Sequence, residues 1–173
     1  MKTLFVSLVS LFVAAVAAPA ADVTATLTEV HLCCKGCVTG VEKAVADIPG
    51  VKVSADQGAG TVTLTGPDAA TVQKAADALV QAGYFGKSSD GAVAMTCNTG
   101  AKGQQVQSLK VEGVHLCCAK CVKAVDRAVK SVPGAKAQTA VKGATSFEVT
   151  GDFNDQALFA ALQKEGLAGR VGK

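Results

Sequence analysis

The chain has 173 residues, a length that allows at most two domains of ordinary size. Hydrophobic residues make up 49% of it, aromatics only 4%, and tryptophan is absent, so we expect cores of valine, alanine and leucine. The formal net charge of +3 is small, and lysine and arginine are not interleaved with aromatic residues, which disfavours nucleic-acid binding.

The first twenty residues differ from the rest. Lys2 is followed by an apolar run over residues 4–16, which is too short to cross a bilayer. Ala-x-Ala triplets at 15–17 and 18–20 match the cleavage rule of a secretory signal. Residues 1–20 are therefore predicted to be a signal peptide rather than an uncleaved anchor. We expect the mature chain to be exported, periplasmic or extracellular, and free of the membrane after cleavage.

Hydrophobic periodicity then predicts the same order of elements twice: strand, helix, strand, strand, helix, strand. Pro49-Gly50 and Pro133-Gly134 end the first helix of each set. The polar, glycine-bearing stretch 97–105 is predicted to be a linker. The expected strands are 22–32, 51–55, 61–65, one starting at 84–85, 106–116, 135–140, 146–150 and 167–171, and the helices begin near 37, 68, 122 and 153.

Each half is thus a βαββαβ unit. Right-handed crossovers place such a unit as an antiparallel four-stranded sheet with both helices on one face. The predicted fold class is α+β, with two tandem ferredoxin-like domains at 22–96 and 106–173. Because each half carries the complete pattern, we expect each to fold alone.

One motif occurs in both halves, as VHLCCKGCV at 30–38 and VHLCCAKCV at 114–122. The two copies hold six of the seven cysteines and both histidines, and each joins the first strand of its half to the first helix. Cys97 has no counterpart, and we predict either intermolecular pairing or no role for it. An internal duplication of this quality indicates that the loops carry the function.

The clustering of the cysteines points to ligation or redox chemistry. An exported protein commonly uses cysteine in disulfides, but a bridge between near neighbours removes little unfolded-state entropy. Thiolates select Cu(I), Zn(II), Cd(II) or Hg(II), with Cu(I) or Zn(II) favoured here, and the loops lack the carboxylates that Ca²⁺ and Mg²⁺ require. With one site per domain, the candidate ligands are His31, Cys33, Cys34 and Cys37, and His115, Cys117, Cys118 and Cys121.

Cys37 and Cys121 are expected to be the main ligands. Both fall in the first turn of a predicted helix, where free N–H groups and the macrodipole favour a thiolate, and Lys35 and Lys120 add positive charge. The loops are expected to lie at the surface. A direct or a supporting role for the two histidines stays open at this point.

The run from Cys37 to Val51 (CVTGVEKAVADIPGV) resembles the heavy-metal-associated domain of copper chaperones, mercury-binding proteins and metal-pumping ATPases. Residues 121–134 (CVKAVDRAVKSVPG) match the same pattern, so the resemblance covers nearly all of the mature chain. It implies a βαββαβ fold, a metal site at a Cys-x-x-Cys pair in the first loop, and a metal-transporting or metal-accepting protein as partner.

The chain departs from that family in the loop itself, where the family has Gly-Met-x-Cys-x-x-Cys. Gly113-Val114 stands at the Gly-Met place of a loop two residues longer, with Glu29-Val30 in the first copy. A second alignment puts Leu32 and Leu116 at the methionine without an insertion. Either way one extra cysteine is present in each copy, so the metal does not follow from the resemblance.

We interpret the chain as an exported protein that is not an enzyme and that buffers, sequesters or transfers soft metal ions. One alternative is an exported thiol–disulfide oxidoreductase, because Cys34-x-x-Cys37 follows a strand and opens a helix. The order of elements and the lack of tryptophan near the motif disfavour it. A disulfide-held interaction module and a structural Cys₃His zinc site are further alternatives.

Overall fold

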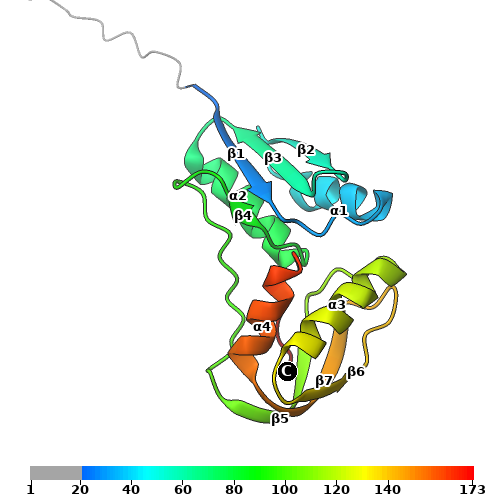
Figure 1. The fold of residues 1–173 in the computed structure, drawn as a ribbon. Coiled ribbons are helices and arrows are strands. Elements are labelled where there is room, and N and C mark those ends of the chain that lie inside the picture. The colour runs from blue at the N-terminus through cyan, green and yellow to red at the C-terminus, as the bar shows by residue number, and fades with distance from the viewer. Residues whose placement is uncertain (1–20) are drawn as a thin grey trace, which may run out of the picture.

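The computed structural model describes residues 21–173 (Figure 1). The predicted signal peptide lies outside the described residues, so its cleavage and the export of the chain stay predictions. Among the helices in residues 21–173, none is long and apolar enough to cross a membrane.

The first domain contains six elements in the predicted order. Its strands form one antiparallel sheet in the order β2-β3-β1-β4. The two helices of this domain contact each other beside that sheet (Figure 1). The elements are β1 (Val23–Thr28), α1 (Lys35–Val45), β2 (Lys52–Asp56), β3 (Thr61–Gly66), α2 (Ala69–Gln81) and β4 (Lys87–Ser88).

The second domain repeats this architecture, with the sheet order β6-β7-β5-β8 and the helices α3 and α4 in contact. The predicted α+β class with two ferredoxin-like domains is therefore confirmed. The elements are β5 (Gln105–Glu112), α3 (Ala119–Ser131), β6 (Ala135–Gln138), β7 (Ser146–Asn154), α4 (Asp155–Lys164) and β8 (Arg170–Val171).

Several predicted element ends differ from the structure. β1 stops at Thr28 because Glu29 takes a left-handed conformation (φ 60°) that turns the chain out of the sheet. β7 runs on to Asn154, whose side chain accepts a hydrogen bond from the Ala157 N–H, so α4 begins at Asp155 and not at 153. The chain around Tyr84 does not continue the sheet of its own domain but pairs with Leu167 of the other.

Valine, alanine and leucine fill most of both cores, as the composition predicts, and three phenylalanines add to the core of the second domain. In the first domain, β1 buries Ala25 and Leu27, and α1 buries Cys37, Val41 and Val45 at successive helical turns. The spacing of four residues places these three on one face of α1, toward the sheet. The first turn of the helix thereby points a cysteine into the interior.

The two domains meet through the segments that follow α2 and α4. The Ala168 N–H donates to the Gly83 carbonyl (3.0 Å), and the Phe85 N–H donates to the Gly166 carbonyl (3.1 Å). Both glycines have positive φ, and a Cβ atom on either would clash with backbone atoms of the opposite domain. This close approach brings the first loop of each domain to the same interface.

The predicted linker is docked against the second domain. The buried carboxylate of Asp155 accepts hydrogen bonds from the Lys102 N–H (2.8 Å) and the Gln104 N–H (2.9 Å). The Val171 N–H donates to the Thr99 carbonyl (2.8 Å). The linker therefore has a defined path, in contrast to a free polar stretch.

Candidate metal centre

The six motif cysteines lie together at the domain interface. The Cys33 Sγ is 3.2 Å from the Cys118 Sγ, and the Cys117 Sγ is 3.4 Å from the sulfurs of both Cys34 and Cys37. Sulfurs within one loop are 3.7 to 3.9 Å apart, so the shorter distances join the two loops. All are free thiols. We call this set the thiol cluster: Cys33, Cys34, Cys37, Cys117, Cys118 and Cys121.

This arrangement corrects the expectation of one separate site per domain. Each loop occupies the predicted junction between the first strand and the first helix of its domain. The interface described above places these junctions against each other, so the sulfurs of one loop have their nearest neighbours in the other. Seven of the eight candidate ligands thus fall into overlapping groups in one region of the molecule, and His115 belongs to no group found in residues 21–173.

The helices α1 and α3 position the thiols in the same way. Cys34 and Cys118 are the N-cap residues, and their carbonyls accept the N–H groups of Cys37 (2.9 Å) and Cys121 (3.1 Å). Cys37 and Cys121 point inward and are fully buried, whereas the other four thiols are half-buried. The loops are therefore partly interior, contrary to the expected surface position.

Burial and thiol neighbours change the acidity of the cluster. The Cys37 thiol, followed by burial, raises the pKa of Cys121, which corrects the expectation that the helix N-terminus and the neighbouring lysine keep it ionised. Burial is also the main cause that raises the pKa of Cys33, and it raises the pKa of Cys117 to about 12.

Cys118 behaves differently within the same cluster. Burial opposes its ionisation, but the nearby N–H groups of Cys121 and Lys120 and the Cys33 thiol outweigh it and lower the pKa of Cys118. This is the effect of a helix N-terminus on a thiol that lies beside its free N–H groups. The cluster thus combines one thiol of lowered pKa, Cys118, with three of raised pKa, Cys33, Cys117 and Cys121.

The two histidines occupy different places. His31 forms a group with Cys33 and Cys121 in which the ligand atoms all lie within 4.8 Å of one another. The His115 ring stacks on Tyr84 with centroids 4.7 Å apart, and burial lowers the pKa of His115. In residues 21–173, the Nε2 atoms of His31 and His115 are buried without a hydrogen-bond partner. Such nitrogens are costly unless they are bound, so they fit a ligand or supporting role.

The donor set fits a soft metal ion. Three further groups of three ligands, all composed of thiols, overlap within the cluster, and no carboxylate belongs to any group found in the described part of the chain. The Lys120 Nζ lies 3.5 Å from the Cys33 carbonyl, so a positive charge that favours thiolate over thiol lies against the first loop. These features favour a cation bound by several thiolates.

Tyr84 is a site residue that the sequence analysis missed. It is almost fully buried, and its hydroxyl donates a hydrogen bond to the Cys37 carbonyl (2.9 Å). Gly40 makes this contact possible, because a Cβ atom there would overlap the Tyr84 hydroxyl. The tyrosine thereby connects the first turn of α1 to the domain interface. The only signal for Tyr84 in the sequence is that it is the one tyrosine of the chain, and that fact does not indicate a role.

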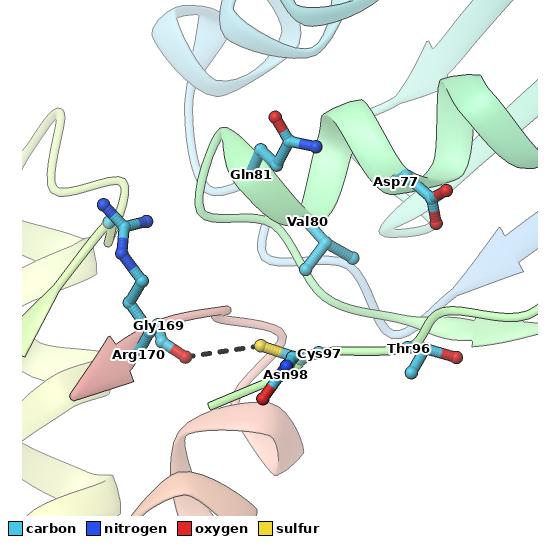
Figure 2. Close-up of a pocket in the computed structure, with 9 residues that line it drawn as sticks. Asp77, Val80, Gln81, Thr96, Cys97, Asn98, Gly169 and Arg170 are labelled. Carbon is cyan, nitrogen blue, oxygen red and sulfur yellow. Dashed lines mark hydrogen bonds between the residues drawn. The ribbon is translucent and has the colours of Figure 1, made fainter. Parts of the chain in front are cut away.

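Cys97 lies outside the thiol cluster. Figure 2 shows it in a pocket of about 280 Å³ beside Val80 and Gln81 of α2, with its thiol directed at the Gly169 carbonyl (3.3 Å). No ligand group found in residues 21–173 includes it. Cys97 therefore offers a matched thiol for control experiments.

Comparison with known proteins matches the family model described as "Heavy-metal-associated domain" to residues 26–85. No curated protein matches the chain. Among solved structures, one similar chain is the solution structure of the N-terminal soluble domains of Bacillus subtilis CopA. It is 15% identical, with a TM-score of 0.32, over 88% of this chain and 95% of that chain.

Proposed function

Because residues 26–85 match the heavy-metal-associated family model and the second half repeats their fold, we propose that this protein binds soft metal ions at its thiol cluster and holds or transfers them outside the cytoplasm. The observation that carries the proposal is the convergence of six free thiols from two loops. Cu(I) is the first candidate and Zn(II) the second, and Cd(II) and Hg(II) share the same preference for sulfur.

The exposure of the thiols supports transfer. Cys34 and Cys118, at the N-caps, are half-buried, while Cys37 and Cys121 behind them are fully buried. A thiol of a metal-donating or metal-accepting protein can therefore exchange first with an N-cap sulfur while the inner sulfurs keep the ion. This order of exchange moves an ion without releasing it, and it requires binding rather than catalysis.

A second candidate function is thiol–disulfide exchange, and one distance favours it. The Cys33 and Cys118 sulfurs, 3.2 Å apart, are the nearest pair in the cluster and come from different domains. A disulfide between them would lock the interface. Its formation would remove two thiols and transfer two electrons to an oxidant such as a partner disulfide.

Elemental analysis of reduced, anaerobically handled chain after exposure to Cu(I) or Zn(II) and gel filtration distinguishes the two functions. Metal that co-elutes with the protein and protects the cluster thiols from alkylation is the expected result. Cys97→Ser should bind as much metal. A chain that holds no metal but cycles between thiol and disulfide states would instead support the oxidoreductase.

The proposed export has its own test. Mass spectrometry of the protein recovered from the non-cytoplasmic fraction should show an N-terminus created by cleavage between residues 17 and 21. An intact Met1 on cytoplasmic protein would contradict it.

A further inference from the structure

The six sulfurs of the thiol cluster form overlapping sets of three. Three of these sets are thiol groups whose ligand atoms lie within 4.8 Å of one another. The remaining sulfurs make a fourth set, because Cys33 lies 3.7 Å from Cys37 and 3.5 Å from Cys121, and the same two sulfurs lie 3.4 Å and 3.7 Å from Cys117, so Cys37 and Cys121 share both neighbours. The four triads are Cys33 with Cys34 and Cys118; Cys34 with Cys37 and Cys117; Cys117 with Cys118 and Cys121; and Cys33 with Cys37 and Cys121.

Every sulfur of the cluster belongs to two of these four triads. Six sulfurs that are each shared by two of four triads lie at the corners of an octahedron. The four triads are alternate faces of that octahedron. The close approach of the sulfurs agrees with a compact set of this kind, since the measured separations run from 3.2 to 3.9 Å.

We infer that the thiol cluster binds four Cu(I) ions as one polynuclear thiolate cluster, with one ion on each triad. This inference rests on the proposed function and specifies its metal and stoichiometry. Six thiolates that each bridge two ions supply twelve bonds, the number that four three-coordinate ions use. Cu(I) accepts two or three thiolates, and thiolates are the ligands that select it.

The tetrahedral ions fit this arrangement less well. Zn(II) takes four ligands in a closed site, so six thiolates complete the coordination of two such ions only if two sulfurs bridge and four are terminal. Terminal sulfurs on different ions would lie far apart. In the structure three of the four triads instead combine sulfurs of the two loops, and the measured distances between the loops run from 3.2 to 3.5 Å.

Charge and proton balance follow from the chemistry. Each thiol that binds loses its proton to solvent, and copper enters and remains as Cu(I), so no electron is transferred. Six thiolates and four monovalent ions leave a net charge of two negative units. The ammonium of Lys120, beside the Cys33 carbonyl, partly offsets that charge.

The triads also predict how loading proceeds. Three of the four contain sulfurs from both domains, so an ion on any of these fixes the interface for the next. We therefore expect cooperative loading, in which the empty and the four-copper forms dominate over intermediates.

The test is a titration of the reduced, anaerobic chain with Cu(I) against a competing chelator, read by native mass spectrometry and by X-ray absorption. The expected result is four copper ions per chain, loaded cooperatively, with three sulfur neighbours per copper and short copper–copper scattering. One or two ions that bind independently, with two sulfur neighbours each, would overturn the inference and leave the proposed function intact. Failure to bind Cu(I) or Zn(II) at all would overturn both.

A pair of variants makes the test specific to shared sulfurs. Cys117→Ser removes one corner of two triads, one of which draws its other sulfurs from the first domain. We expect it to hold at most two copper ions without cooperativity, whereas Cys97→Ser holds four. Cys34→Ser gives the same test from the first domain if Cys117→Ser does not fold. If either cluster variant affects only the copper bound by its own domain, the shared cluster is wrong.

Discussion

The two domains have the same fold but differ where each meets the other. In the first domain, Tyr84 follows α2 and packs against Gly40 of α1. In the second domain, Leu167 stands in place of Tyr84 and Ala124 in place of Gly40. In the first domain this pair adds a hydrogen bond to the Cys37 carbonyl. The duplicated halves thus share their scaffold and differ in the contacts that support the thiol cluster. Only the first half carries the tyrosine, which contacts the Cys37 carbonyl of its own domain and the His115 ring of the other.

The largest effect is expected from a charge placed in the hydrophobic core of one domain. Val41→Asp and Val125→Asp each place a charge at a fully buried position, which should lower the free energy of unfolding by about 4 kcal/mol or more. Because the cluster draws on both domains, either change should abolish tight copper binding by the whole chain. Urea denaturation and copper titration measure the two effects.

Val141→Asp is the matched control for this experiment, because Val141 is 61% exposed and should tolerate the change. A chain with one half unfolded that keeps half of its copper would show two independent sites.

A smaller effect follows from separating the domains without unfolding them. A Cβ atom at Gly83 or Gly166 would clash with the opposite domain, so Gly83→Ala and Gly166→Ala should open the interface and weaken copper binding at least tenfold. Both residues also have positive φ, which adds about 1 kcal/mol of backbone strain in each case.

Gly143→Ala separates these causes, because Gly143 has φ 85° but nothing within 4 Å of the added Cβ. It should reproduce the strain in a thermal melt and leave copper affinity unchanged. Equal losses of affinity in all three variants would show that the interface is not the cause.

The second helix of each domain, α2 or α4, begins near an aspartate, and the two aspartates can be compared by the pH dependence of stability. Burial opposes ionisation of Asp155, but N–H groups of Lys102, Gln104 and Gln156 outweigh it and lower its pKa. In the first domain, hydrogen bonds from the Thr71 N–H lower the pKa of the exposed Asp68.

A depressed folded pKa stabilises the protein above the unfolded value of about 4, and that stability is lost as the pH falls through the folded pKa. Asp155→Asn should therefore lower the free energy of unfolding by about 2 kcal/mol at pH 7 and flatten its fall in acid. Asp68→Asn should change it less. Urea denaturation at several pH values measures both, and equal effects would contradict the role of burial.

The smallest effect is expected when Tyr84 and Gly40 are replaced by the residue types found at the same places in the second domain. Gly40→Ala improves helix propensity by about 1 kcal/mol but overlaps the Tyr84 hydroxyl, so we expect a net destabilisation of about 1 kcal/mol. Adding Tyr84→Leu should recover part of the loss, since the first domain then has the pair found in the second. A thermal melt of the single and double variants decides this, and a more stable Gly40→Ala chain would show that the tyrosine moves without cost.

Most of the fold could be predicted from sequence because its signals are local. The spacing of Val41 and Val45 specifies a helix face, and Pro49-Gly50 marks its end, without knowledge of the rest of the chain. The motif cysteines could be placed at the junction of strand and helix for the same reason. The ends of elements depend on contacts from afar, as the capping by Asn154 shows.

The joining of two sites into one could not be predicted in this way. It depends on Gly83 and Gly166 approaching the backbone of the opposite domain, and a single glycine after a helix is equally typical of an ordinary helix end. The raised pKa of Cys121 has the same origin, since its main cause is the Cys37 thiol of the other half. Periodicity describes each half and contains no information on how the halves dock.

The docked linker has a consequence for how the protein responds to dilution. Asp155 ties Lys102 and Gln104 to the second domain, so only a short stretch of undocked chain joins the two domains that carry the cysteine loops. Loops on two domains that are joined by a short connection meet at an effective concentration on the order of millimolar, whatever the concentration of the protein. Six sulfurs can therefore assemble around copper within a single chain at nanomolar abundance, where two separate one-domain proteins would remain apart.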